Sequence, residues 1–165
     1  MAPLARPPRR FRSVIEGVAW EHPDAVALRE ARRREIAQMY GREGSEPAGS
    51  EATADDTAVF FVAYDDGRAV GCGALRLLGD GVAEVKRMFV VPDQRGSGQS
   101  TAILRALEEW ALGHRVQTLR LETGDLLVAA QRFYEREGFT MIPPFGPYIE
   151  SSLSRCYEKR LAESP

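Results

Sequence analysis

The sequence predicts one domain of mixed α/β class, a largely antiparallel sheet with helices packed on it. Three observations lead to this prediction. The chain has 165 residues, an ordinary length for a single domain. Apolar residues recur at the helical period of about 3.6 in three segments and alternate with a period of two in most of the others. Turns rich in glycine and aspartate separate the strands in the middle of the chain.

The first twelve residues are rich in proline and arginine, and no apolar segment follows them. They are expected to form a disordered tail and not a secretory signal. An anionic partner that binds this tail is the alternative. Residues 13–165 are then the folded domain, and Ser13–Val18 is expected to be its first short strand.

The first helix is predicted to begin at His22-Pro23-Asp24 and to end at Gly41. Proline is tolerated in a first turn because its missing N–H has no partner there. The apolar stripe consists of Leu28, Ala31, Ile36 and Met39. The basic residues of this helix are Arg29, Arg32, Arg33 and Arg34. We expect them to form a solvated face paired with Glu30 and Glu35.

A loop over residues 42–56 precedes a run of three strands. The strands are predicted over residues 57–64, 69–78 and 82–91, with turns at 65–68 and 79–81. Helical spacing returns after Pro92 and ends near Gly113, followed by a strand at 116–122. The last elements are a helix around residues 126–134 capped by Gly138, an extended segment at 139–142, and a strand at 155–161.

Composition excludes several classes of protein. The net charge of −2 gives no global attraction to nucleic acid, so no such partner is expected. No apolar run approaches the ~18 residues of a membrane span, so no membrane partner is expected either. Cys72 and Cys156 lack the spacing of a zinc site and are too few for a disulfide framework, so no metal is expected. Free thiols of this kind fit a cytoplasmic protein.

The most informative segment joins the strand at 82–91 to the following helix. It reads Arg95-Gly96-Ser97-Gly98-Gln99-Ser100. Backbone N–H groups of such a turn can converge on an anion at a helix N-terminus, where the helix dipole also favours negative charge. The alternative is a turn that only initiates the helix. The segment lacks the Lys-Ser/Thr ending of a Walker loop and the spacing of a dinucleotide fingerprint.

This segment resembles the R/Q-x-x-G-x-G/A acyl-CoA loop of the GNAT superfamily of N-acetyltransferases. Residues 83–92 are similar to that family's fourth strand, and residues 130–139 resemble its A-x-x-(F/L)-Y-x-x-x-G-F segment. The resemblance covers residues 58–161 and keeps the family's order. Ile142–Tyr148 (I-P-P-F-G-x-Y) also resembles a loop of a bacterial subgroup.

The resemblance implies a sheet that splays between its fourth and fifth strands, flanked by helices. It implies acetyl transfer from acetyl-CoA to a primary amine of a small molecule, by direct attack in a ternary complex. The backbone of Met88, Phe89 and Val90 would hold the pantetheine arm. Residues 95–100 would hold the pyrophosphate. Ser100 and Leu127 depart from the pattern, and leucine removes one polar contact to the cofactor.

Three residues are candidates for proton transfer. An ammonium must lose a proton before its nitrogen can attack, and the resemblance offers Glu84 as the base or as part of a water relay. Glu122 is the second candidate, as a base or as a contact to a cationic acceptor. An ion pair of Glu84 with Lys86 remains the alternative role. Tyr134 matches the family's general acid, and its alternative role is a core aromatic.

Phe145 and Tyr148 are expected either to wall the acceptor pocket or to pack beneath the proline-rich loop. A nucleophilic role for Cys72 is the less favoured interpretation of this residue. Three other functions stay open: a non-catalytic acyl-CoA-binding module, a protein N-acetyltransferase, and a domain that binds another nucleotide. The resemblance leaves open whether the protein is a homodimer.

Overall fold

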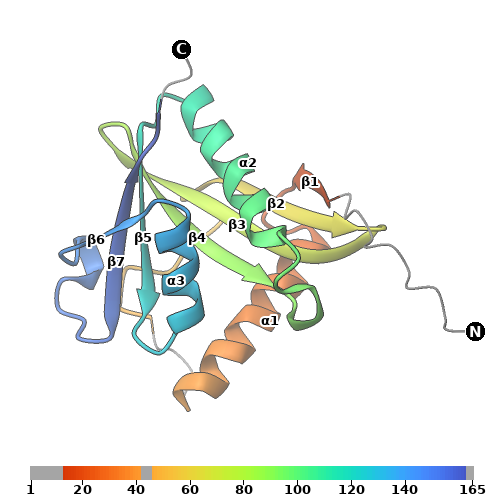
Figure 1. The fold of residues 1–165 in the computed structure, drawn as a ribbon, viewed down its shortest axis with the longest axis horizontal. Helices are drawn as coiled ribbons and strands as arrows, with labels where there is room; N and C mark the ends of the chain where they lie inside the picture. The colour runs from red at the N-terminus through yellow and green to blue at the C-terminus, as the bar shows by residue number, and fades with distance from the viewer. Residues whose placement is uncertain (1–12, 42–45, 163–165) are drawn as a thin grey trace, which may run out of the picture.

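The computed structural model describes residues 13–41 and 46–162 (Figure 1). The predicted tail over residues 1–12 lies outside the described residues, and so do residues 42–45 of the predicted loop. No helix in the described segments has the length and apolar character needed to span a membrane.

Seven strands form a single mixed sheet in the order β1-β2-β3-β4-β5-β7-β6. The strands are β1 (Ser13–Gly17), β2 (Thr57–Asp65), β3 (Arg68–Gly79), β4 (Val82–Val90), β5 (Thr118–Gly124), β6 (Thr140–Ile142) and β7 (Ser154–Arg160). All pairs are antiparallel except β4 and β5. The predicted class and the predicted meander are therefore confirmed, with strand ends within two residues of those expected.

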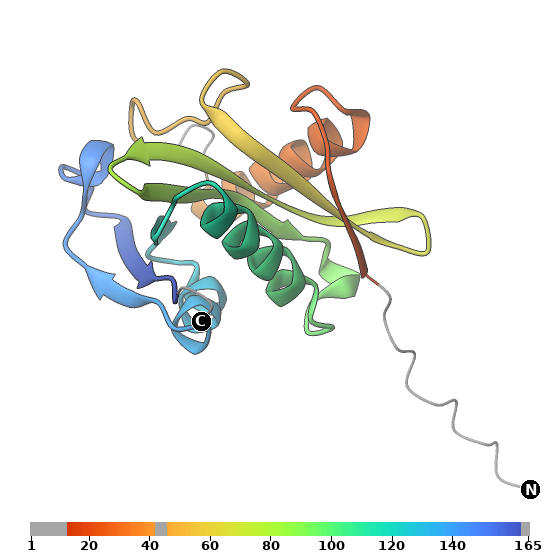
Figure 2. The same ribbon diagram turned by 90° about the horizontal axis from the view of Figure 1, so that it is seen from above.

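Three helices cover the two faces of this sheet (Figures 1 and 2). They are α1 (Pro23–Tyr40), α2 (Gln99–Gly113) and α3 (Val128–Arg136). One core cluster joins α1 to β2 and β3 through Ala25, Leu28, Phe60 and Cys72. A larger cluster joins α2 and α3 to the opposite face, and the apolar stripe of α2 supplies Ile103, Leu104, Leu107 and Ala111. The amphipathic pattern therefore sets which face of the sheet each helix covers.

The ends of α1 follow the sequence signals. The His22 side chain accepts a hydrogen bond from the Asp24 N–H, which satisfies one of the unpaired donors of the first turn. Gly41 adopts φ 69°, and its N–H bonds the Ala37 carbonyl. This left-handed conformation is the one that glycine adopts readily at a helix end.

The sheet divides between β4 and β5. Their parallel pairing runs only from Val82 with Thr118 to Val85 with Leu121. β4 continues to Val90 beside β3, whereas β5 continues to Gly124 beside β7. Figure 1 shows the two strands diverging toward their carboxyl ends. This divergence opens the interior of the sheet where β4 and β5 end.

Gly73 lies where α2 packs closely on β3, which gives a prediction about stability. A Cβ at this position would lie 2.6 Å from Met88 Sδ and 2.7 Å from Ile103 Cγ2. Gly73→Ala is expected to lower the free energy of unfolding by about 1–3 kcal/mol, because the core must move to admit the methyl group. Gly113→Ala is the matched control, since nothing lies within 4 Å of its Cβ position. Urea denaturation should show this control to be neutral or slightly stabilising, and equal effects of the two substitutions would contradict the packing argument.

Candidate active site

A cavity of about 650 Å³ lies where β4 and β5 diverge. Its floor is β4 from Val85 to Val90, and its walls come from α1, the loop before α2, the end of β5 and α3. The apolar stripe of α1 contributes Ile36 and Met39 to the wall. Polar and apolar groups from distant parts of the sequence therefore converge on one enclosed space.

A β-bulge shapes the floor of this cavity. Ala74 pairs with Lys86 and Cys72 pairs with Phe89, so β4 carries one extra residue in this stretch. Arg87 has φ 58°, a left-handed conformation that few non-glycine residues adopt. Beyond Val85, the edge of β4 that faces β5 has no strand partner within the described chain. The backbone groups of Met88–Val90 that point to this edge can bond a ligand in the cavity, except for the Val90 carbonyl, which accepts a hydrogen bond from Arg95.

The loop before α2 forms one end of the cavity. Gly96 has φ 76° and Gly98 has φ 90°, conformations that require glycine, and no atom lies within 4 Å of either Cβ position. Gly98 caps α2, so the first N–H groups of the helix point toward this open side. Arg95 is positioned by the Val90 carbonyl at 2.9 Å and by Glu35 at 2.8 Å. The loop is therefore open on the side where the sequence analysis expects a phosphate group, and phosphate binding there stays a prediction.

Unsatisfied polar atoms are concentrated at the cavity. Five buried side-chain atoms lack a hydrogen-bond partner among the described residues, and four belong to residues that line it. These four are Glu46 Oε2, Gln94 Oε1, Gln99 Nε2 and Thr123 Oγ1. A buried polar atom without a partner is costly, so these four residues carry unmet hydrogen-bonding capacity next to the cavity. The amide of Gln99, at the start of α2, accepts a hydrogen bond from the Ser13 hydroxyl through Oε1, and its Nε2 is buried.

Two of the predicted proton-transfer residues line the cavity. Burial raises the pKa of Glu122 above its ordinary value, and the Ser154 hydroxyl and the charges of Lys86 and Arg32 only partly oppose this rise. Burial also raises the pKa of Tyr134, so this phenol keeps its proton at neutral pH. Tyr134 lines the cavity, and no hydrogen bond of its hydroxyl is found among the described residues. Glu122 and Tyr134 are therefore two ionisable groups in one cavity whose pKa values burial raises.

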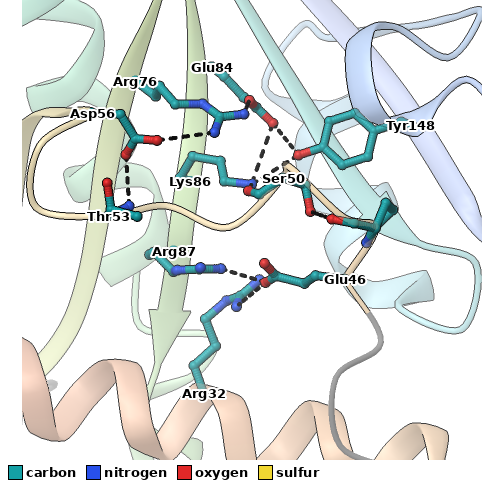
Figure 3. Close-up of polar contacts among 11 residues, drawn as sticks. Arg32, Glu46, Ser50, Thr53, Asp56, Arg76, Glu84, Lys86, Arg87 and Tyr148 are labelled. Atoms are coloured by element: carbon teal, nitrogen blue, oxygen red, sulfur yellow. Dashed lines mark hydrogen bonds and ion pairs between the residues drawn. The ribbon is translucent and has the colours of Figure 1, made fainter.

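Glu84 does not line the cavity and lies in a polar network with Arg76, Lys86 and Tyr148 (Figure 3). Its carboxylate accepts a hydrogen bond from Arg76 at 2.8 Å and one from the Tyr148 hydroxyl at 2.5 Å. Lys86 lies 3.6 Å from it and donates to the Tyr148 hydroxyl and to the Ser50 carbonyl. Glu84 is 0% exposed and is not among the residues that line the cavity. This geometry favours the alternative role of Glu84, an ion pair with Lys86, over a role as the base.

Phe145 and Tyr148 also lie outside the cavity lining. Their rings pack edge to face at 5.3 Å, and Tyr148 is completely buried. This arrangement favours packing beneath the proline-rich loop over a role in the acceptor pocket. The sequence reasoning missed Arg32, Tyr40, Glu46 and Arg87, which do line the cavity. The helical spacing of Arg32, Ile36, Met39 and Tyr40 could have indicated that these residues share one face of α1.

The reactivity of Cys72 and Cys156 can distinguish a nucleophilic cysteine from one that only packs in the core. Burial raises the pKa of Cys72 to about 12, and the thiol donates to the Arg87 carbonyl at 3.1 Å. Cys156 is also buried, which raises its pKa. Neither thiol should react with Ellman's reagent in the native protein, and both should react after unfolding in guanidinium chloride. Rapid reaction of one thiol in the native protein would restore Cys72 as a candidate nucleophile.

The chain is similar to several known proteins over most of its length. Residues 22–139 match the profile of the acetyltransferase (GNAT) family. The chain is 36% identical over 148 residues to an IAA acetyltransferase from Azospirillum brasilense, covering 87% of this chain and 97% of that protein. A structure solved as a candidate acyl-CoA N-acyltransferase from Klebsiella pneumoniae superposes with a TM-score of 0.79 at 30% identity, over 92% of this chain and 99% of that one. A Thermoplasma acidophilum N-acetyltransferase, solved with coenzyme A, shares the fold at 17% identity with a TM-score of 0.67, over 90% and 98% of the two chains.

Proposed function

The chain belongs to the GNAT family of acetyltransferases and is an acyltransferase, and from this premise we propose that it acetylates a primary amine of a small molecule with acetyl-CoA. The acetyl group passes directly to the amine in a ternary complex. One observation carries the proposal: Glu122, Tyr134 and the glycine-rich loop before α2 line the same cavity.

The residues along the cavity fit acetyl-CoA, which supplies an activated thioester. Arg95, the glycine-rich turn and the start of α2 offer cationic and N–H donors to the pyrophosphate. The unpaired edge of β4 at Met88–Val90 offers backbone groups to the amide-containing arm. Leu127 lines the same cavity and contributes an apolar contact in place of a polar one.

Glu122 is proposed as the base that takes the proton from the acceptor ammonium. Its raised pKa moves it toward the working pH, where a base is most effective, and its place in the cavity gives it access to the amine. A backbone N–H of the bulged strand stabilises the negative charge that develops on the carbonyl oxygen. Tyr134 is proposed to protonate the thiolate that leaves. Glu84 is proposed to hold β3, β4 and the 146–148 turn together.

The proposal is tested by thermal unfolding with acetyl-CoA, CoA, ATP and NAD added separately. A ligand at about 100 times its dissociation constant stabilises the protein by about 2.7 kcal/mol, which raises the melting temperature by a few degrees. Acetyl-CoA and CoA should each give this shift, whereas ATP and NAD should not. An amine panel with thiol detection then measures turnover. Absence of a shift with both CoA species would overturn the proposal, and a shift without turnover on any amine would indicate a non-catalytic acyl-CoA-binding module.

A further inference from the structure

Two arginines and one glutamate meet at the wall of the cavity (Figure 3). Arg32 comes from α1, Arg87 from the bulge of β4, and Glu46 from the segment that precedes β2. The Glu46 carboxylate lies 2.5 Å from Arg87 Nη1 and 3.5 Å from Arg32 Nη1. The three residues are far apart in sequence, so only the fold brings them together.

This contact leaves much of the capacity of the two guanidinium groups unused. Glu46 meets both arginines with the same oxygen, Oε1, while its Oε2 is buried without a partner among the described residues. Each arginine uses only its Nη1 in these pairs. A guanidinium has five N–H donors in a planar fork that suits a carboxylate held by two hydrogen bonds. Arg32 and Arg87 therefore keep N–H donors that their pairs with Glu46 do not use.

The charge balance at this wall also calls for an anion. Lys86 is committed to the buried network with Glu84 and Tyr148, and Arg95 is paired with Glu35 at the other end of the cavity. Arg32 and Arg87 both pair directly with Glu46, and the charge of Arg32 also acts on the buried carboxyl group of Glu122. The Arg87 side chain is only 13% exposed, so solvent does little to compensate its charge.

We propose that Arg32 and Arg87 bind a carboxylate group of the acceptor, so that the acceptor is an amino acid or a similar amine that carries a carboxylate. This inference rests on the proposed acetyl transfer and names the class of its acceptor. Glu46 occupies the carboxylate site in the absence of that acceptor.

The position of Arg32 supports this assignment. Its charge opposes the burial-driven rise in the pKa of both Glu122 and Tyr134, so it lies near both proton-transfer groups. An acceptor whose carboxylate is held at Arg32 and Arg87 can therefore present its amine to Glu122. Burial raises the pKa of Glu46, but Arg87 and Arg32 outweigh this and hold its pKa below the ordinary value, as the same site would do for an acceptor carboxylate.

The test compares amines that differ only in whether they carry a carboxylate group. The panel contains α-, β- and γ-amino acids, each paired with its carboxamide, which keeps the amine and the side chain but lacks the negative charge. Binding to the CoA-loaded protein is measured by calorimetry, and turnover is measured with acetyl-CoA. At least one amino acid should bind about ten- to a hundredfold more tightly than its amide, the usual value of charge-assisted hydrogen bonds.

Single substitutions identify the residues that cause the preference for the amino acid over its amide. Arg87→Gln and Arg32→Gln should each remove the discrimination between acid and amide, while Arg34→Gln, on the exposed side of α1, should retain it. Glu46→Gln should lower the KM for the amino acid several-fold, because it removes the competing carboxylate. If Glu46 had only a structural role, Glu46→Gln would not tighten the binding of the amino acid.

The outcomes separate this inference from the proposed function. Turnover of amines with equal preference for acid and amide would overturn the inference and leave acetyl transfer intact. Binding of an amino acid that depends on Arg32 and Arg87, without turnover of any amine, would overturn acetyl transfer and support the carboxylate site. No binding of any amino acid to the CoA-loaded protein would overturn the inference.

Discussion

Glu122→Gln is expected to lower kcat by about 10²–10⁴-fold, the usual contribution of a general base. The amide cannot take a proton from the acceptor, yet it has nearly the same size and shape as the carboxylate. The measurement is CoA release from acetyl-CoA with the best amine of the panel. Acetyl-CoA binding should be unchanged, because the cofactor groups proposed here lie on β4 and the loop before α2.

The stability of the same variant distinguishes a base from a structural carboxylate. Burial raises the pKa of Glu122, which means that the folded protein disfavours its charged form. Replacing it with a neutral side chain should therefore leave the free energy of unfolding unchanged or raise it slightly at neutral pH. Loss of activity together with a large loss of stability would point to a structural role.

Glu84→Gln, unlike Glu122→Gln, is expected to lower stability: the free energy of unfolding should fall by about 3–5 kcal/mol. Glu84 is completely buried and accepts hydrogen bonds from Arg76 and Tyr148, with Lys86 nearby. The substitution leaves two cations without their central counter-ion and places an N–H₂ group against donors. Urea denaturation measures the loss, and residual activity should follow the folded fraction.

An exposed ion pair supplies the control for Glu84. Glu30 bonds Arg33 and Arg34 on the surface of α1, where solvent screens the charges. Glu30→Gln should leave the urea midpoint nearly unchanged. If Glu84→Gln kept wild-type stability but lost activity, Glu84 and not Glu122 would be the better candidate for the base.

Much of the fold follows from local patterns in the sequence. The strand period, the Asp-Gly turns and the apolar stripe of α2 predict β2, β3, β4 and the helix that packs on them. The glycine-rich turn before α2 adopts the open, left-handed geometry expected of it. These features depend on neighbours in the chain, which the sequence displays directly.

The acceptor side of the site depends on contacts that no local pattern encodes. The basic cluster of α1 was expected to be a solvated face, and Arg33 and Arg34 do pair with Glu30. Arg32, however, turns into the cavity and meets Glu46, and Arg29 donates to the Trp20 carbonyl and stacks on that ring. The bulge that aims Arg87 at Glu46 arises from the register between β3 and β4. Alternation along β4 predicts a shared face for Glu84 and Met88 but does not reveal this interruption.

The pH dependence of kcat in the wild type and in Glu122→Gln tests the central claim most directly. A base must be deprotonated to act, so wild-type kcat should rise with pH through the pKa of Glu122, which lies above the ordinary carboxyl value of 4.5. In Glu122→Gln this limb should disappear and the rate should stay low across the same range. If the variant kept the same limb at a rate near that of the wild type, another group would be the base and the proposed role of Glu122 would be contradicted.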